Sequence, residues 1–295
     1  MPCYHPLDAW QRESGEVVFS ESGRIARSLK LPCGQCVGCR LERSRQWAVR
    51  CMHEASLHSQ NCFITLTYDE EHLPQYGSLD YRDFQLFMKK LRKRLGKARF
   101  YMCGEYGELN SRPHFHACLF GVDFDDKEPF RLLDSGCRLF TSKTLSELWP
   151  KGFASIGDVT FESAAYVARY VMKKVTGSAA CAHYTRLDPM TGELYEVSPE
   201  FNRMSLKPGI GAKWFEKWHK DVYPHDYVVV NGHEAKPPRF YDKLYARLDS
   251  FGAELLQAHR YKKAAAFLDD STPHRLSVRE TVTKARLAFK KRTLE

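Results

Sequence analysis

Two histidines separated by one bulky apolar residue, His114 and His116, have the spacing that most directly suggests chemistry. In an extended strand, successive side chains alternate between the two faces, so both imidazoles point one way while Phe115 points the other way. Two adjacent imidazoles can bind a divalent metal, each through one ring nitrogen. The same spacing also fits an ordinary pair of surface histidines, so other residues must decide between the two interpretations.

A carboxylate lies close enough in the chain to complete such a metal site. Residues 100–106 read as a strand and residues 107–113 as a loop before the histidine strand, which together predict a hairpin. Pairing across this hairpin can bring Glu105 beside both histidines, with Glu108 as a rival ligand. Two ring nitrogens and one carboxylate leave positions open for substrate oxygens. This ligand set suits Mg²⁺ or Mn²⁺ acting on a phosphate.

A pair of tyrosines follows on an expected helix over residues 163–175. Tyr166 and Tyr170 are one turn apart on the same face. Arg169 and Lys173 each follow a tyrosine by three residues, so each hydroxyl has a cation one turn along. A tyrosine can act as a nucleophile and form a covalent intermediate, whose charge a nearby cation stabilises. The alternative is that both tyrosines simply pack into a core.

Three cysteines in two overlapping Cys-x-x-Cys units predict a second metal site. Structural zinc takes four tetrahedral ligands, so Cys33, Cys36 and Cys39 need a fourth. Cys3 is the first choice and His5 the alternative. An iron–sulfur cluster, or free thiols in a turn, are the alternatives to zinc. Ten cysteines in a chain expected to stay unexported favour thiols or metal ligands over a disulfide framework.

The composition is that of a folded, basic protein. The 295 residues allow one large domain or two smaller ones, and the 43% hydrophobic content argues against disorder. A formal charge of +9 is concentrated in residues 89–99 and near the C-terminus. Clustered cations suggest a polyanionic partner, most commonly nucleic acid. We find no apolar run long enough for a membrane span and no leader pattern, so we expect no membrane partner.

The apolar pattern along the chain predicts an α+β fold with three regions. Residues 41–58 and 80–95 read as helices and residues 62–68 as a strand. The first thirty residues and residues 177–199 read as irregular or loop-like, and the last fifty as largely helical. The expected regions are a Cys-rich part with a zinc knuckle and a helix (1–59), a core with the histidines and tyrosines (60–178), and a basic, partly helical extension (179–295).

The order of these motifs resembles the HUH (His-hydrophobic-His) rolling-circle endonucleases. The strand at residues 62–68 is followed by Pro-His-Phe-His and then by Tyr-x-x-x-Tyr-x-x-Lys. More narrowly, residues 1–245 resemble the replication-initiation proteins of small single-stranded DNA phages, the microviruses of gokushovirus type. The stretches that carry this resemblance are Cys-Gly-x-Cys-x-x-Cys-Arg, Phe-Ile-Thr-Leu-Thr-Tyr, Gly-Glu-Tyr-Gly, Arg-Pro-His-Phe-His and Met-Ser-Leu-Lys-Pro-Gly-Ile-Gly.

The resemblance implies a ferredoxin- or RRM-like core, in which a central antiparallel sheet bears the metal site and the tyrosine helix packs across it. It implies nicking of one strand at the phage replication origin, with a 5′-phosphotyrosyl link and a free 3′-OH, followed by strand transfer and circle closure. Lys173 matches the family's lysine after the second tyrosine, and Arg169 stands where relatives can carry lysine. Host polymerase and helicase are the implied further partners, and the host cytoplasm the implied location.

Two other functions fit parts of the sequence. A single-strand transposase of the same nuclease fold would share the histidines, although such relatives usually carry one tyrosine. A non-catalytic zinc-bearing DNA-binding protein would explain the cysteines and the basic clusters but not the His-x-His strand. Which tyrosine attacks first also stays open.

Overall fold

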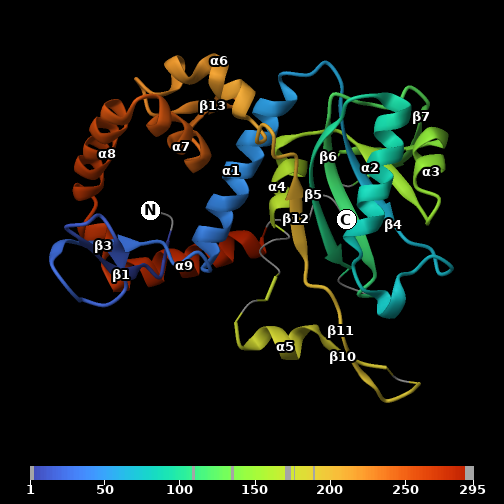
Figure 1. The fold of residues 1–295 in the computed structure, drawn as a ribbon, viewed down its shortest axis with the longest axis horizontal. Coiled ribbons are helices and arrows are strands. Elements are labelled where there is room, and N and C mark those ends of the chain that lie inside the picture. Colours follow the sequence, from blue (N-terminus) through green and yellow to red (C-terminus); the bar gives the residue numbers. More distant parts are fainter. Residues whose placement is uncertain are drawn as a thin grey trace. The chain divides into compact units, whose positions relative to one another are not determined.

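A computed structural model describes residues 3–107, 110–133, 136–169, 174–175, 177–188 and 190–289 of the chain (Figure 1). The described residues group into two units. One combines residues up to Arg43 with those from Tyr245 onward, and the other is Ser44–Leu244. Two helices run across the boundary between the units, α1 (Val37–Ala55) and α7 (Arg239–Leu248). Each unit is described by itself below.

The first unit contains a small antiparallel sheet in the order β2-β1-β3. Our expectation that the first thirty residues are irregular is therefore wrong. The side chains of these strands are exposed or only partly buried, apart from the buried Ala9, so backbone pairing holds the sheet without an apolar signature. The unit's elements are β1 (Leu7–Arg12), β2 (Val17–Val18), β3 (Ile25–Leu31), α8 (Ser250–Ala265), the 3₁₀ turn η3 (Asp269–Ser271) and α9 (Pro273–Ala288).

The second unit is built on a seven-stranded antiparallel sheet in the order β12-β5-β6-β4-β9-β8-β7. The histidine strand β6 lies near its middle, between β5 and β4. The strands are β4 (Asn61–Thr67), β5 (Arg99–Tyr106), β6 (Pro113–Phe120), β7 (Lys127–Leu132), β8 (Arg138–Ser142), β9 (Ala154–Gly157) and β12 (Phe201–Met204). The expected strands over residues 62–68 and 100–106 are confirmed within one residue.

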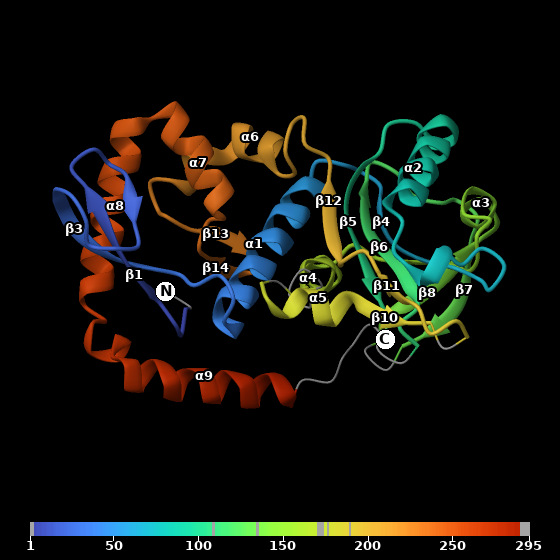
Figure 2. The same cartoon turned by 60° about the horizontal axis from the view of Figure 1, so that its bottom comes forward.

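Helices cover both faces of this sheet (Figures 1 and 2). On one face, α2 (Tyr81–Leu95) and α3 (Lys143–Leu148) close an apolar core that contains Phe115. On the other face, α4 (Phe161–Arg169) and the end of α1 close a second core that contains Cys118 and Phe120 of β6. The α+β class with a large antiparallel sheet flanked by helices is confirmed.

Helix α2 illustrates how the sequence encodes these elements. Asp80 caps its first turn by accepting a hydrogen bond from the backbone N–H of Arg82, and Gly96 ends it at a φ of 91°. Phe84, Phe87 and Leu91 recur at helical spacing and are buried against the sheet. The helix predicted over residues 80–95 is therefore confirmed.

Residues 177–199, expected to be loop-like, contain regular structure. Helix α5 (Ala179–Tyr184) leads into a hairpin of β10 (Thr185–Leu187) and β11 (Leu194–Glu196). The unit is completed by the 3₁₀ turn η1 (Gln75–Gly77), α6 (Ala212–Val222), β13 (Val228–Val230) and β14 (His233–Ala235). Among the described residues, no helix combines the length and the apolar character that a membrane span requires.

Candidate active site

The pairing of three neighbouring strands brings the expected metal ligands together. Glu105 of β5 lies directly opposite His114 of β6. On the other side of β6, Thr65 of β4 lies opposite His116. Residues opposite each other in a sheet point to the same face, so the carboxylate and both imidazoles share one face.

The three side chains converge on one point. Oε1 of Glu105 is 2.7 Å from Nε2 of His114 and 2.9 Å from Nε2 of His116. One ligand atom from each of the three residues lies within 4.8 Å of the others. His116 is only 6% exposed, because α4 and the second core cover this face. The site is partly enclosed by protein.

Hydrogen bonds to the remaining ring nitrogens orient both histidines. Nδ1 of His114 is 3.1 Å from the backbone oxygen of Arg112, and Nδ1 of His116 is 2.9 Å from the hydroxyl of Thr65. A carbonyl oxygen only accepts, so Nδ1 of His114 donates the hydrogen bond to it, and Nε2 is the ring nitrogen that faces Glu105. Both Nε2 atoms therefore point toward Glu105 as metal-binding nitrogens would. The donor set fits a divalent cation.

The electrostatics of Glu105 favour its charged form. Burial by itself raises the pKa of this carboxyl, but hydrogen bonds from His114 and then from His116 outweigh burial, and the net pKa lies below the usual value. A buried carboxylate that remains charged is the form that binds a cation.

Tyr166 lies against this site. Its ring meets the ring of His116 edge-on, with centroids 5.1 Å apart and planes at 84°. Helix α4, which carries Tyr166, is tied to α1 by a hydrogen bond from the hydroxyl of Ser44 to the backbone oxygen of Ala165. Arg169 is exposed at the end of α4. Tyr170, Lys173 and Glu108 lie outside the described residues.

The first unit brings four cysteines together as a second candidate metal site. The sulfur atoms of Cys3, Cys33, Cys36 and Cys39 all lie within 4.8 Å of one another. His5, the alternative fourth ligand, instead pairs with Glu280 of α9 at 2.7 Å. The structure thus places the first-choice residue, Cys3, in the cluster.

Backbone N–H groups donate to these sulfurs, as in a metal knuckle. The N–H of Cys33 donates to the sulfur of Cys3, and the N–H of Cys36 donates to the sulfur of Cys33, both at 3.3 Å. Gly34 has a φ of 77°, which lets the chain turn between the two cysteines. Burial raises the pKa of Cys36, but hydrogen bonds led by the N–H of Tyr4 lower it overall to about 6. Four converging sulfur atoms fit a tetrahedral zinc ion.

Sequence reasoning missed the residues that orient the histidines. Thr65 and Thr67 alternate with apolar residues in β4, and this alternation indicates that both side chains point to the same face of the strand. The role of Thr65 depends on which strand lies beside β4, which its own sequence does not specify. Arg112 acts through its backbone oxygen, and its guanidinium donates to the backbone oxygen of Tyr68. No sequence signal identifies such a backbone role.

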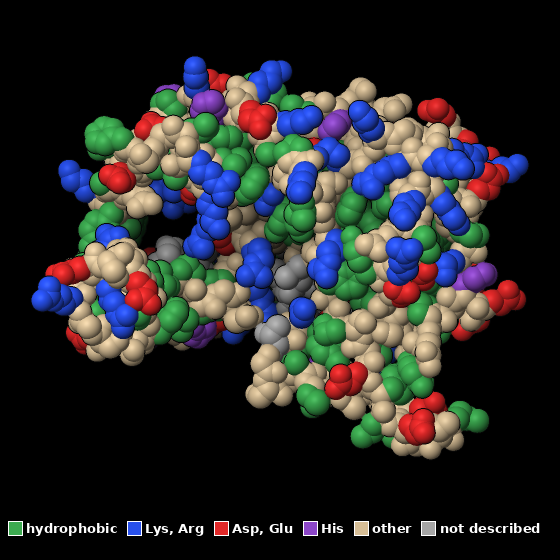
Figure 3. Space-filling model, viewed as in Figure 1, with side chains coloured by type: hydrophobic (Ala, Val, Ile, Leu, Met, Phe, Trp, Pro, Cys, Tyr) green, Lys and Arg blue, Asp and Glu red, His purple; other side chains and the backbone are tan. Residues whose placement is uncertain are grey.

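Most of the expected basic cluster lies on the exposed side of α2. Figure 3 shows Lys and Arg side chains gathered over this helix, opposite its buried apolar face. Arg99 is different, because it lies on β5 and pairs with the buried carboxylate of Glu54. The exposed cations are Lys89, Lys90, Arg92, Lys93, Arg94 and Lys97.

Comparisons with known proteins agree on one family. The family described as replication-associated protein ORF2/G2P matches residues 61–175, which include the metal-site residues and Tyr166. The chain is 35% identical to replication-associated protein VP4 of Bdellovibrio phage phiMH2K, over 84% of this chain and 78% of that protein. It is 33% identical to replication-associated protein ORF2 of Spiroplasma virus 4, over 90% and 87% of the two chains. Replication-associated protein ORF4 of Chlamydia phage 1 is 30% identical to this chain, over 77% of this chain and 56% of that protein. No solved structure matches the chain significantly.

Proposed function

The chain belongs to the replication-associated proteins of single-stranded DNA phages, and from this premise we propose that it is an HUH-type nickase that starts rolling-circle replication. The observation that carries the proposal is the convergence of Glu105, His114 and His116, with the ring of Tyr166 packed edge-on against that of His116. A divalent site beside a tyrosine is what transfer of a phosphodiester to a phenol requires.

The proposed metal ligands are His114, His116 and Glu105. When bound there, Mg²⁺ or Mn²⁺ polarises the scissile phosphate and offsets the charge that develops on it. Thr65 and the backbone oxygen of Arg112 hold the two imidazoles in place through their Nδ1 atoms. This preorganisation keeps both Nε2 atoms directed toward Glu105.

The proposed nucleophile is the phenol oxygen of Tyr166 or Tyr170. Having lost its proton, that oxygen bonds to the scissile phosphorus, while the bond from phosphorus to the 3′ oxygen breaks. The 3′ oxygen takes a proton and becomes the free 3′-OH, and the 5′ end remains as a phosphotyrosyl ester. Tyr166 is our first choice because it contacts His116. Arg169 and Lys173 are proposed to stabilise charge on the phosphate or the phenolate.

Two tyrosines would allow a complete replication cycle. While one tyrosine holds the first 5′ end, the second cuts the regenerated origin, and the released 3′-OH attacks the first phosphotyrosyl bond to close a circle. Host polymerase would extend the 3′-OH and host helicase would unwind the duplex, in the host cytoplasm. The Cys3, Cys33, Cys36 and Cys39 site is proposed to hold a structural zinc.

The test is incubation of the protein with circular single-stranded DNA of the parent genome and Mg²⁺ or Mn²⁺. We expect a covalent protein–DNA adduct that maps to Tyr166 or Tyr170, and none without a divalent cation. The Y166F/Y170F double variant should form no adduct, and the two single variants identify the first nucleophile. An adduct formed by the double variant would overturn the assignment. Tight, salt-sensitive DNA binding without nicking would favour a non-catalytic DNA-binding protein instead.

A further inference from the structure

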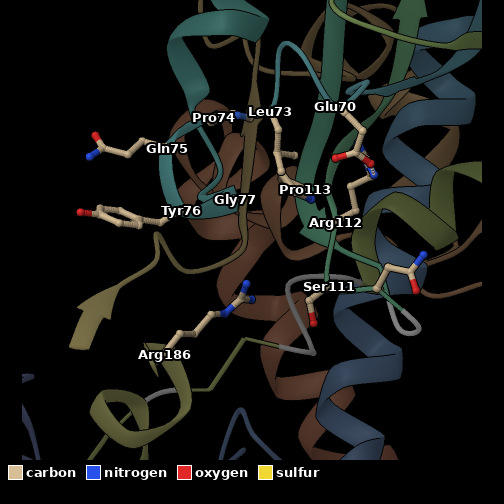
Figure 4. Close-up of a pocket in the computed structure, with 11 residues that line it drawn as sticks. Glu70, Leu73, Pro74, Gln75, Tyr76, Gly77, Ser111, Arg112, Pro113 and Arg186 are labelled. Carbon is tan, nitrogen blue, oxygen red and sulfur yellow. Dashed lines mark hydrogen bonds and ion pairs between the residues drawn. The ribbon is translucent and has the colours of Figure 1, made fainter. Parts of the chain in front are cut away.

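An open groove of about 630 Å³ lies at the beginning of β6, the strand that carries His114 and His116. Arg112 and Pro113 form one wall, and the next residue along the chain is the metal ligand His114. Turn η1, with Tyr76 and Gly77, forms a second wall (Figure 4). Its volume falls in the range of pockets that hold small organic ligands.

A cation extends into the groove, and the residues that the structure describes give it no anionic partner. Figure 4 shows Arg186 of β10 extending toward the space between Gly77 and Ser111. Its guanidinium lies 4.7 Å from the centroid of the Tyr106 ring, and within the described ranges it forms no hydrogen bond or ion pair. The acid of the groove, Glu70, is paired with Arg112 at 2.6 Å. Among the described residues, the groove therefore offers one half-buried positive charge, that of Arg186, to an anion.

An aromatic ring stands at the edge of the same groove. Tyr76 is 46% exposed, and its ring stacks on Tyr195 of β11 at 4.4 Å with 18° between the planes. Its backbone has a φ of 58°, a left-handed conformation that is unusual for an aromatic residue. Ser111, on the facing wall, has a φ of 49°. Strained backbone on both walls is typical of ligand-binding segments.

We propose that this groove binds a nucleotide of the single-stranded DNA substrate, with Arg186 contacting a backbone phosphate and Tyr76 stacking on a base. The proposal rests on the proposed nicking function. A free guanidinium beside an exposed aromatic ring is the combination that single-stranded nucleic acids recognise, because each nucleotide offers one phosphate and one aromatic face. The amide side chains of Gln75 and Asn110 add polar groups to the groove.

The test measures DNA binding separately from cleavage. A fluorescein-labelled oligothymidylate of about 15 nucleotides is titrated with the full chain, without divalent metal, at several salt concentrations. We expect R186A and Y76A each to weaken binding about tenfold, and Y76F to bind like wild type because the aromatic ring remains. R186A should also make the slope of log K against log salt less steep by about 0.7, since one phosphate contact is lost.

Matched controls use exposed residues outside the groove, R131A on β7 and Y261A on α8, which should bind like wild type. If Y76A does not fold, R186Q tests the groove without disturbing the tyrosine stack. Binding by R186A and R186Q at wild-type strength overturns the proposal. Adduct formation on parent circular DNA, measured on the same wild-type preparation, tests the nickase separately. A wild-type adduct with unchanged binding by the variants refutes only the groove, and weakened binding without a wild-type adduct refutes only the nickase.

Discussion

At the scale of single residues, the proposed chemistry depends on groups that are not metal ligands themselves but orient the ligands. His116 presents Nε2 toward Glu105 because the hydroxyl of Thr65 holds its Nδ1. His114 is held in the same way by the backbone oxygen of Arg112. Without these contacts each imidazole could rotate, and the ligand atoms would no longer converge. The affinity for metal is therefore set partly by residues outside the ligand set.

Replacing Thr65 with valine tests this dependence, because valine keeps the shape and removes the hydroxyl. We expect T65V to bind Mn²⁺ roughly 10- to 100-fold more weakly than wild type, as measured by titration calorimetry. T67V is the matched control, since Thr67 lies on the same strand and its hydroxyl donates to the backbone oxygen of Phe153. Equal Mn²⁺ affinities of T65V and wild type would exclude the orienting role.

His53 predicts a pH dependence of stability. Burial lowers its pKa to about 3, and its ring stacks on Trp214 with centroids 3.6 Å apart. Below the ordinary pKa of about 6.5, the unfolded chain binds a proton that the folded chain excludes. The contribution of His53 to the free energy of unfolding is thus complete above about pH 6.5. It falls by up to about 1.4 kcal/mol per pH unit as the pH drops toward 3.

Urea unfolding of wild type and H53F between pH 5 and pH 7 measures this contribution. The phenyl ring keeps the stack but does not titrate, so the unfolding free energy of H53F should depend less steeply on pH. H259A, which changes an exposed histidine, should keep the wild-type slope. Parallel slopes for H53F and wild type would contradict the prediction.

At the scale of elements, a buried ion pair joins α1, β5 and the segment before α6. Glu54 of α1 is 1% exposed and pairs with Arg99 of β5. The second carboxylate oxygen of Glu54 accepts the N–H of Gly211 at 2.7 Å, and Arg99 donates to the backbone oxygen of Pro208 at 2.7 Å. The Pro-Gly-Ile-Gly stretch is therefore held against the sheet by hydrogen bonds to charged groups.

Removing one partner of this pair should be costly. We expect E54A to lower the free energy of unfolding by about 3–5 kcal/mol, because Arg99 is left half-buried without its carboxylate. E147A is the control: Glu147 forms an exposed pair with Arg94, and its loss should cost less than about 1 kcal/mol. Urea unfolding of both variants measures the difference. A cost for E54A as small as that for E147A would refute the structural role of the pair.

The elements that the sequence predicted well are those with a strong periodic pattern. Alternation marked β4, and helical spacing of Phe84, Phe87 and Leu91 marked α2. The strands β1 to β3 and the β10–β11 hairpin were missed because they bury few side chains and depend on pairing partners. The sequence also predicted that Glu105 reaches both histidines. It did not predict the burial of His116, which results from the packing of a helix distant in the chain.

At the scale of the whole molecule, the two candidate metal sites belong to different units. The four cysteines all precede Ser44, whereas Glu105, His114 and His116 belong to the unit Ser44–Leu244. The second unit has two apolar cores, on the two faces of its sheet. The small sheet of the first unit buries little apolar surface, and a small fold of this kind commonly depends on a metal for stability. The two sites should therefore respond separately to metal removal.

Replacement of a single cysteine tests this separation. We expect about one zinc per chain in wild type by elemental analysis and clearly less in C36S, because a tetrahedral site loses one of four thiolates. Limited proteolysis of C36S should cut faster before Ser44. Binding of Mn²⁺ at the histidine site should persist, since no ligand is shared between the two sites. C181S, which changes an exposed cysteine outside the cluster, should keep its zinc and should be cut by protease as slowly as wild type. Wild-type protein without zinc, or C36S with unchanged proteolysis, would show that this cluster does not hold the first unit together.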